Sequence, residues 1–407
     1  GTYERYVILK VGECYSEFQE FKIIIGDAPE VSFTWEGLTR DNPTTFTLFN
    51  ENEIVQDNEI QEVRLEINDN TTPAFSLSGG GTFTNEVTFD HTFPTEGVYN
   101  VSLFMRTSEV CRDSIERQVR MLDILSVDEN NGYLQDFESS DGGWFAEYRL
   151  NNGKEDGRVS SWEWGSPGNT IISNAFSGNN AWVTNLTGDY QGSEQSWVYS
   201  PAFDISNLEI PIISFQHQHW LFNNRDGVVF QYSRDNGRTW KQLGSVTDIG
   251  GLLESSGRNW YTHFEINSSP GVYKINDESI IQEFNEIRNT NGSIQSFSYG
   301  WADVQSDEPD PVGEWLLSIN KMDEADTVIF RFAMATSAGD NDEGFAFDNF
   351  RIYDSDKITL LETFINATED GAVDAVQDIN GIVSQQSTGS IGWITYLTDL
   401  DLSSTTS

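Results

Sequence analysis

Apolar and polar residues alternate with a period of two over much of the first 125 positions, which predicts β-strands. The alternation is clearest in Val31–Trp35, Thr45–Asn50, Val63–Ile67, Val87–Phe89 and Val98–Phe104. Gly, Asn and Asp lie between these runs and are typical of turns. Strands at this spacing predict an Ig-like sandwich over residues 30–126.

A short passage occurs twice, about a hundred residues apart. Gly1–Tyr3 opens an alternating run that leads to Cys14, and Gly97–Tyr99 opens another that leads to Cys111. A repeat of this period is typical of tandem sandwiches. We therefore interpret residues 1–28 as the C-terminal portion of another sandwich and expect residue 1 to lie inside a module of a longer protein.

Residues 30–126 resemble the polycystic kidney disease (PKD) domain family, and residues 1–28 share some of this resemblance. His91–Val101 matches the family's His-x-Phe/Tyr…Gly-x-Tyr-x-Val stretch, whereas Leu65–Asn70 stands where members carry Trp-x-Phe-Gly-Asp-Gly. Asn at both glycine positions still tolerates a left-handed turn. The resemblance implies extracellular spacing and adhesion, without catalytic residues.

Beyond Leu134 the strands become longer, and ten of the twelve tryptophans lie between Trp144 and Trp315. This pattern predicts a larger two-sheet jelly roll over about 130–355. Its ordered segments are Leu134–Glu138, Gly142–Phe145, Trp162–Pro167, Ala181–Thr184, Ser200–Asp204, Ile212–Phe215, Asp226–Ser233 and Gly344–Ile352.

This ordered set resembles the MAM-like jelly rolls found beside proteases and adhesins in exported bacterial surface proteins. Such modules are common in bacteria that use type IX secretion, and PKD repeats often precede them. An insertion at about 250–312 departs from the compact family pattern. We expect it to hold a helix at Glu278–Ile287 and a loop that faces a partner.

The last segment, 357–407, is similar to the start of a thioredoxin-like domain. Ile358–Phe364 and Ile391–Tyr396 read as strands, and an apolar helix face is predicted between them from Val373, Val376, Ile379 and Val383. The Cys-x-x-Cys of redox-active members is missing, so we exclude redox chemistry. The predicted fold class is therefore mainly β: tandem Ig-like sandwiches, a larger jelly roll and a truncated α/β C-terminal segment.

The net charge of −42, from 65 acidic and 23 basic residues, argues against nucleic acid and anionic lipid as partners. It suits Ca²⁺, which prefers carboxylate and carbonyl oxygens, although a solvated acidic coat explains most of the acids as well. No run of eighteen apolar residues occurs, so we expect no direct membrane insertion. Two cysteines are too few for a disulfide scaffold, and we expect Cys14 and Cys111 to be buried thiols.

Glu138 on the opening strand and Asp348 on the closing strand become neighbours if the ends of the jelly roll pair. Asp226, before Gly227, could add a third oxygen from a loop, so these three are the candidate Ca²⁺ ligands. Hydrogen-bonded carboxylates without metal are the simpler interpretation.

The segment Ser233–Trp240 fits the Asp-box pattern of sialidase propellers. The carboxylate of Asp235 would accept N–H groups across the turn, with Ser233 and Thr239 beside it. Gly237 would supply a positive φ, and Trp240 would pack beneath. Only one box is present and no blade repeat accompanies it, so we favour a structural turn over a glycosidase.

Two further groups have both a functional and a structural interpretation. Trp162 and Trp164, together with Trp182 and Trp197, offer a stacking platform for sugar rings, although most tryptophans of a jelly roll belong to its core. His217 and His219 are two apart on a strand, which suits a metal pair, but no third ligand is near and we favour a packed pair.

These patterns favour a noncatalytic segment of a large exported bacterial cell-surface protein. Its partners would be proteins at the cell surface or the outer-membrane secretion or gliding machinery, and its location would be extracellular. Two alternatives stay open: accessory domains of a secreted protease or glycan-degrading enzyme, and a carbohydrate-binding module that takes glycans.

Overall fold

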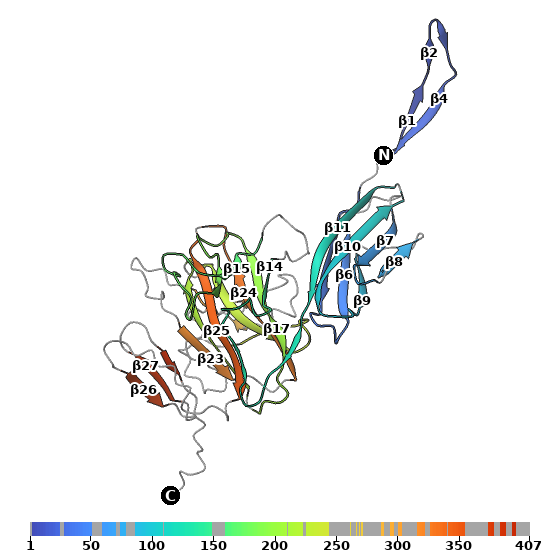
Figure 1. The fold of residues 1–407 in the computed structure, drawn as a ribbon. Helices are drawn as coiled ribbons and strands as arrows, with labels where there is room; N and C mark the ends of the chain where they lie inside the picture. Colours follow the sequence, from blue (N-terminus) through green and yellow to red (C-terminus); the bar gives the residue numbers. More distant parts are fainter. Residues whose placement is uncertain are drawn as a thin grey trace. The chain divides into compact units, whose positions relative to one another are not determined.

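The computed structural model describes residues 2–24, 28–50, 59–70, 74–78, 86–108, 110–148, 159–209, 211–222, 225–243, 261, 266, 268, 270–271, 286–288, 294–296, 300–302, 316–321, 326–339, 341–354, 373–377, 383–387 and 393–395. Contacts divide the chain into two units: unit 1 comprises Gly1–Leu122 and Asn152–Lys154, and unit 2 comprises Asp123–Asn151 and Glu155–Ser407. The described residues form strands, turns and irregular segments without an α-helix, which confirms the mainly β prediction (Figure 1). Consistently, this portion of the chain offers no helix that could cross a membrane.

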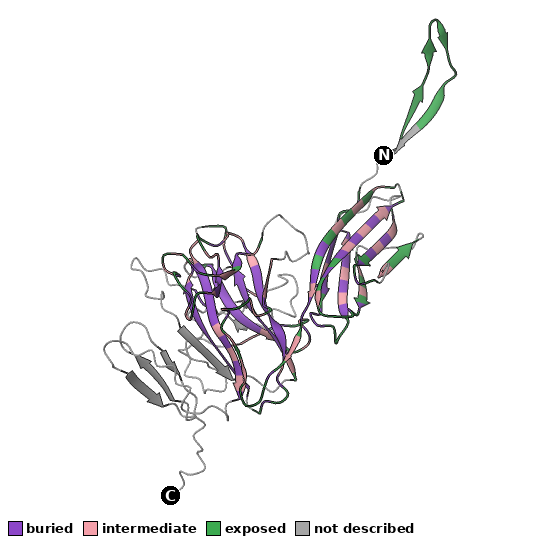
Figure 2. Cartoon of the chain, in the orientation of Figure 1, coloured by how far each residue is buried: buried purple, intermediate pink, exposed green. Residues whose placement is uncertain are grey.

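Residues 31–121 of unit 1 form two sheets with the orders β5-β6-β9 and β11-β10-β7-β8. The strands are β5 (Val31–Glu36), β6 (Thr44–Asn50), β7 (Ile60–Ile67), β8 (Phe75–Ser78), β9 (Glu86–His91), β10 (Gly97–Thr107) and β11 (Arg112–Met121). All neighbours are antiparallel. Buried and partly exposed residues alternate along β6 and β10, because only one face of each sheet meets the core (Figure 2).

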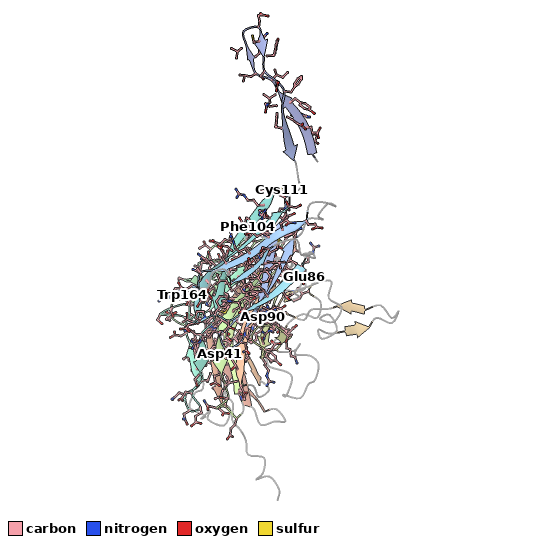
Figure 3. All side chains as sticks on the ribbon, turned by 90° about the vertical axis from the view of Figure 1, so that its right-hand side faces the viewer. Asp41, Glu86, Asp90, Phe104, Cys111 and Trp164 are labelled. Atoms are coloured by element: carbon pink, nitrogen blue, oxygen red, sulfur yellow. The ribbon has the colours of Figure 1, made fainter. Side chains whose placement is uncertain are left out.

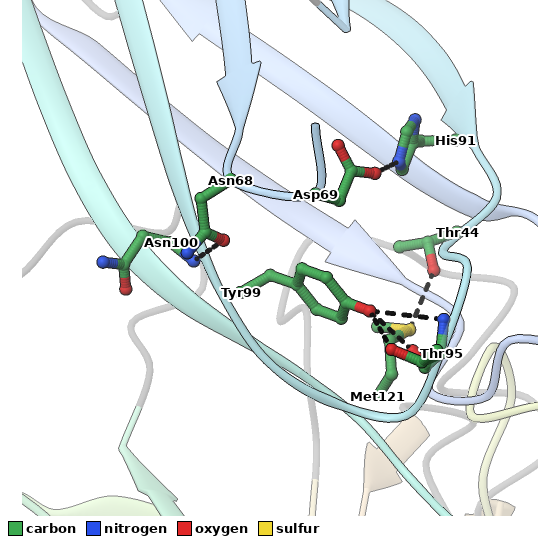
Figure 4. Close-up of polar contacts among 8 residues, drawn as sticks. All are labelled: Thr44, Asn68, Asp69, His91, Thr95, Tyr99, Asn100 and Met121. Atoms are coloured by element: carbon green, nitrogen blue, oxygen red, sulfur yellow. Dashed lines mark hydrogen bonds and ion pairs between the residues drawn. The ribbon is translucent and has the colours of Figure 1, made fainter. Parts of the chain in front are cut away.

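The turn before β10 is held by a tyrosine corner, a feature of Ig-like sandwiches in which a hydroxyl binds the backbone a few residues upstream. The Tyr99 hydroxyl donates to the carbonyl of Thr95 at 2.8 Å (Figure 4). Nearby, the His91 Nε2 and Asp69 Oδ2 atoms lie 2.6 Å apart, and both residues are buried. Asn70 has φ 70°, so the degraded glycine motif does adopt a left-handed turn.

The first residues of unit 1 form an antiparallel hairpin of β1 (Thr2–Val7) and β4 (Gln19–Ile24). Its tip carries β2 (Lys10–Val11) paired with β3 (Cys14–Tyr15). Cys14 is exposed and Cys111 is partly buried, and neither forms a disulfide. The prediction of two buried thiols is therefore wrong, because each cysteine lies at the connection of its hairpin rather than on an inward strand position.

Unit 2 contains two large sheets. The first has the order β12-β17-β24-β19-β20 with β14 added to β17, and the second has the order β15-β16-β25-β18-β23 with β13 added to β25. The first comprises β12 (Ile124–Ser126), β14 (Phe145–Tyr148), β17 (Gln195–Asp204), β19 (Gly227–Ser233), β20 (Lys241–Gln242) and β24 (Thr327–Ala335). The second comprises β13 (Tyr133–Gln135), β15 (Trp162–Gly165), β16 (Ala181–Thr184), β18 (Pro211–Trp220), β23 (Leu316–Lys321) and β25 (Gly344–Asp354). The opening strand β13 pairs with the closing strand β25, as the calcium hypothesis required.

Aromatic rings fill the space between these two sheets. Phe332 of β24 stacks on Phe347 of β25 with ring centroids 4.2 Å apart, and Trp144 packs on the same Phe347 at 5.1 Å. Unlike the strands of unit 1, β18 and β24 are buried at nearly every position. Segments outside the strands therefore cover the outer faces of these sheets as well.

Two helices expected from the sequence are not found. Val373–Gln377 and Val383–Ser387 are strands β26 and β27, which form an antiparallel sheet with β28 (Trp393–Thr395). The helix predicted across Val373 to Val383 is therefore wrong, since spaced valines suit a strand face equally well. Glu286–Arg288 is strand β21, paired with β22 (Ile294–Ser296), so the helix expected to end at Ile287 is wrong there. The remainder of that helix, the Ile358–Phe364 strand and much of the insertion lie outside the described residues.

Candidate functional site

A long loop, residues 166–180, covers the outer face of the second sheet of unit 2. Its residues Ile172 and Ala175 join a small apolar cluster with Ala181, Val183 and Ala346 of that sheet. The loop has no regular secondary structure of its own. Its backbone N–H groups must therefore find acceptors elsewhere.

Three carboxylates supply these acceptors. Glu343 accepts from the N–H groups of Thr170, Ile171 and Ile172 at 2.7–3.1 Å. Asp348 accepts from the N–H of Ser177 at 2.9 Å, and Glu138 accepts from those of Asn179 and Asn180 at 2.8–2.9 Å. The loop is thus fastened to the start of β25, to the middle of β25 and to the segment after β13.

Asp348 is the most perturbed acid of this group. Its pKa is raised from 3.8 to about 7: burial is the largest cause and the negative charge of Glu138 adds to it, while hydrogen bonds from Ser177 and Asn349 act in the opposite direction. The structure therefore brings Glu138 and Asp348 together, as the pairing of the opening and closing strands predicted. A buried carboxylate beside a second, partly buried one can attract a proton or a hard cation.

Further oxygen atoms lie beside this pair. Gln216 of β18 is the direct neighbour of Asp348 across the sheet. Its side chain is buried, and its Oε1 has no hydrogen-bond partner among the described residues. This oxygen fits the donor chemistry of Ca²⁺, whereas the N–H groups of loop 166–180 occupy some of the carboxylate lone pairs that a metal would need.

Asp226, the third candidate ligand, belongs to a different cluster. It accepts a hydrogen bond from the Tyr190 hydroxyl at 2.8 Å and one from the N–H of Ser337 at 2.6 Å. Burial raises the pKa of Asp226, and burial together with the Asp226 charge raises the pKa of Tyr190. Nowhere in the described ranges do three acidic, His or Cys side chains gather at metal-binding distance, so the predicted three-carboxylate site is wrong.

The Asp-box forms a closed hydrogen-bonded turn after β19. Asp235 Oδ1 accepts from the N–H of Thr239 at 2.8 Å, and Asp235 Oδ2 accepts from its hydroxyl at 2.6 Å. Ser233 Oγ donates to Asp235 at 2.8 Å, and Gly237 has φ 81°. Burial acts to raise the pKa of Asp235, but these hydrogen bonds outweigh it and the pKa lies below its ordinary value.

Trp240, the last residue of the box, packs on a buried arginine that was not among the residues expected from the sequence. The guanidinium of Arg331 lies 3.9 Å from the centroid of the Trp240 ring, and its Nε donates to Gln231 at 2.7 Å. Trp197 and Tyr199 of β17 flank the same guanidinium. The sequence does contain a signal for this cluster, which is the single Arg inside the apolar run Thr327–Ala335. A charged residue is seldom fully buried without partners, so an Arg in a buried strand indicates that partners surround it.

The tryptophans of the predicted sugar-stacking platform do not form an exposed surface. Trp162 is buried in the core against Phe332, Phe345 and Phe347, so its assignment to a glycan platform is wrong. Trp164, labelled in Figure 3, is partly buried, and its Nε1 donates to the carbonyl of Phe137 at 2.9 Å. Trp182 and Trp197 are buried as well.

His217 and His219 are fully buried between the sheets. Their rings stack at 5.6 Å, and His217 also stacks on Phe345 at 5.5 Å. This environment agrees with the preferred interpretation of a packed pair. A hydrated metal ion would need oxygen or nitrogen ligands where these aromatic rings stand.

No protein-family model matches the chain. Among curated proteins, Bacillopeptidase F of Bacillus subtilis (strain 168) is 34% identical over 152 residues, which are 35% of this chain and 10% of that protein. The chain thus spans about a tenth of the length of this relative.

Among solved structures, the K1 cleaved adhesin domain of Lys-gingipain from Porphyromonas gingivalis W83 is 12% identical, with a TM-score of 0.29, and the match covers 55% of this chain and 98% of that chain. SGBP-B from a xyloglucan utilization locus of Bacteroides uniformis is 11% identical, with a TM-score of 0.20, and the match covers 81% and 100%. TM-scores this low do not establish a shared fold.

Proposed function

We propose that this chain is a noncatalytic segment of an extracellular protein, in which the sandwiches of unit 1 act as spacers and the jelly roll of unit 2 contacts a partner. In its fuller form, the proposal places the segment in a large bacterial cell-surface protein that serves adhesion or docks to secretion or gliding machinery.

One observation carries the proposal. In the described segments of unit 2, several polar side chains that chemistry could use are engaged in separate structural contacts. Asp235 closes a turn, Glu343 and Glu138 fasten a loop, and His217 stacks in the aromatic core. Catalysis needs such groups to converge on a common reacting atom.

Purified chain should bind to the surface of the producing cells and should not hydrolyse casein or aryl glycosides. Antibodies against residues 130–355 should label intact cells, and external protease should remove the label. Hydrolysis that copurifies with the chain through successive columns would overturn the proposal. Binding to a glycan array without binding to cells would instead favour the carbohydrate-binding alternative.

A second candidate is an accessory region of a secreted peptidase, and the match to Bacillopeptidase F supports it. In that role the jelly roll would hold a protein substrate near a catalytic domain. The chain should then sediment with insoluble protein substrates such as fibrous collagen, with the same chain after heat denaturation as the control. Absence of sedimentation would remove this candidate.

We further propose that Glu138 and Asp348 hold Ca²⁺, with Gln216 Oε1 as a third oxygen. The two carboxylates and the buried amide oxygen support this assignment, and the metal would supply structural stiffening rather than chemistry. Calorimetry should show a higher midpoint of unfolding in Ca²⁺ than in chelator, because a ligand that binds only the folded state stabilises it. An unchanged midpoint would end this assignment.

A further inference from the structure

Basic side chains are rare on the surface of unit 2, and most of them gather at one place. The chain carries 23 basic residues against 65 acidic ones. Among the side chains of unit 2 that the structure describes, four basic ones are exposed: Arg225, Arg234, Arg238 and Lys241. The last three belong to the Asp-box turn and to strand β20, which follows it. Such a concentration of positive charge on an acidic protein favours contact with an anionic ligand.

The acid of this turn, Asp235, pairs with none of these cations. Its two oxygens accept hydrogen bonds from the N–H and hydroxyl of Thr239 and from the hydroxyl of Ser233. Within the described part of the chain, Arg234 and Lys241 form no ion pair. The charges of these two side chains are therefore available to a ligand.

The turn presents its basic side chains on a fixed backbone. The N–H of Gly237 donates to Ser233 Oγ at 2.8 Å, and Trp240 Nε1 donates to the carbonyl of Gly237 at 3.0 Å. The ring of Trp240 packs on the buried guanidinium of Arg331 and so anchors the turn on the sheet. A site that is ordered before binding spends less entropy when the ligand arrives.

Acidic residues limit the width of this basic surface. Ser233 pairs with Ile329 of β24, and two positions away on β24 Thr327 pairs with Asp204 of β17. Asp326, next to Thr327, is exposed. A lipid surface or a nucleic-acid duplex is broad and would meet these acids as well. A thin anionic chain can contact the turn alone, because at physiological salt charges more than about 8 Å away are largely screened.

The composition of the chain itself narrows the choice of anion. Arginine binds oxyanions through paired N–H donors, and carboxylate, phosphate and sulfate all fit this geometry. Every copy of the chain presents 65 acidic residues, so a turn that favoured carboxylates would bind the protein to itself. A sulfate ester differs from these carboxylates in shape and stays ionised across the pH range in which proteins fold. Sulfate on a thin polymer therefore fits the turn best.

We propose that the Asp-box turn binds a sulfated polysaccharide through Arg234, Arg238 and Lys241. Each arginine holds a sulfate group through its paired N–H donors, and the lysine attracts the same chain as a point charge. This assignment rests on the extracellular role proposed above, because sulfated polysaccharides lie outside cells, and it names a class of partner for unit 2.

Binding of the purified full chain to immobilised dextran sulfate at about 150 mM salt tests the proposal. Arg234→Gln should weaken binding about threefold, and Arg234→Gln with Lys241→Gln about tenfold, because each change removes one exposed charge contact. Arg225→Gln is the matched control: it removes an exposed arginine from the opposite end of β19 and should leave binding unchanged. The unfolding midpoint of all three variants should stay at the wild-type value, since Arg234 and Lys241 are exposed.

Other polymers separate sulfate from charge and from sugar. Unsulfated dextran, polygalacturonate and polyglutamate should each bind at least about tenfold more weakly than dextran sulfate. Equal binding by Arg234→Gln and wild type, or an equal loss in Arg225→Gln, would overturn the proposal. Polyglutamate that binds as tightly as dextran sulfate would assign the turn to acidic peptides and overturn it as well.

Binding to the producing cells, measured in parallel, distinguishes this inference from the proposed function. A wild-type chain that binds cells but not dextran sulfate would overturn the glycan assignment and leave the proposed function standing. A chain that binds dextran sulfate through the turn but does not bind cells would support the assignment and contradict the proposed surface role.

Discussion

Replacing Asp348 by Asn should make unit 2 more stable at alkaline pH when no divalent cation is present. Asp348 is fully buried, and its carboxylate has Glu138 as a negative neighbour. Asn has nearly the same shape and retains an oxygen that can accept from the N–H of Ser177. The substitution therefore removes the ionisation and preserves the loop contact.

The magnitude follows from the difference between the folded and unfolded states. The pKa of Asp348 rises from 3.8 to about 7 on folding, so the folded state holds this proton more tightly. The contribution is fully present below pH 3.8 and is lost as the pH rises through the folded pKa of about 7. At roughly 1.4 kcal/mol for each pKa unit, the loss is about 4 kcal/mol at most. The neutral amide accepts more weakly, which costs about 1–2 kcal/mol, so we expect a net gain of about 2 kcal/mol at pH 8 or above.

Guanidinium unfolding followed by tryptophan fluorescence provides the assay, because ten of the twelve tryptophans lie between Trp144 and Trp315. Measurements in chelator from about pH 5.5 to about pH 8.5 should show the wild-type free energy of unfolding falling by about 2 kcal/mol relative to Asp348→Asn. Asp204→Asn is the control, since that carboxylate closes a local turn with Ser206. A wild-type pH slope in Asp348→Asn, or a loss of stability at pH 8, would contradict a raised pKa of Asp348 in the folded state.

The remaining predictions concern the Asp-box turn, loop 166–180, the tyrosine corner at Tyr99 and the proposed Ca²⁺ site. Asp235→Ala should destabilise unit 2 by about 2–3 kcal/mol in the same assay, because three hydrogen bonds lose their acceptor; no change would mean that the turn is not stabilising. Gly178→Ala should cost more than 1 kcal/mol, since Gly178 has φ 59° and a Cβ there would meet the carboxylate of Glu138; Gly188→Ala, with open space around it but also a positive φ, separates the collision from the backbone strain. Tyr99→Phe should cost about 1–2 kcal/mol in unit 1, and faster amide exchange confined to unit 1 checks it. If Ca²⁺ binds at the proposed site, it should raise the unfolding midpoint of wild type and not that of Asp348→Asn; equal shifts would place the ion elsewhere.

The alternation of apolar residues was sufficient to predict β5, β6, β7, β9 and β10 of unit 1, whereas β8 and β11 were not among the predicted runs. Val31–Trp35 and Val98–Phe104 lie in β5 and β10, because a sheet with one buried face imposes a period of two on its sequence. The spacing of apolar residues gave a wrong prediction between Val373 and Val383, where a helix was expected. Valines at these spacings are compatible with a helix face and with short strands, and local sequence does not decide between the two.

Part of the candidate site could likewise be predicted from the sequence, and part could not. Opening and closing strands of a jelly roll pair, and this topological rule was enough to bring Glu138 and Asp348 together. It gave no information about Asp226, whose partners Tyr190 and Ser337 come from loops far apart in the chain. Burial was equally hidden for Trp162, since an aromatic residue is used both in cores and in binding surfaces.

By itself, the sequence determined the β-rich class of this protein, the hairpin repeat and the Asp-box turn, because each depends on residues close together in the chain. Tertiary structure alone decided which carboxylates fasten loop 166–180 and which ring covers Arg331. These features depend on contacts between distant segments. Hydrogen bonds and burial at such contacts act over a few ångströms. Groups from distant segments come within that range only when the chain is folded.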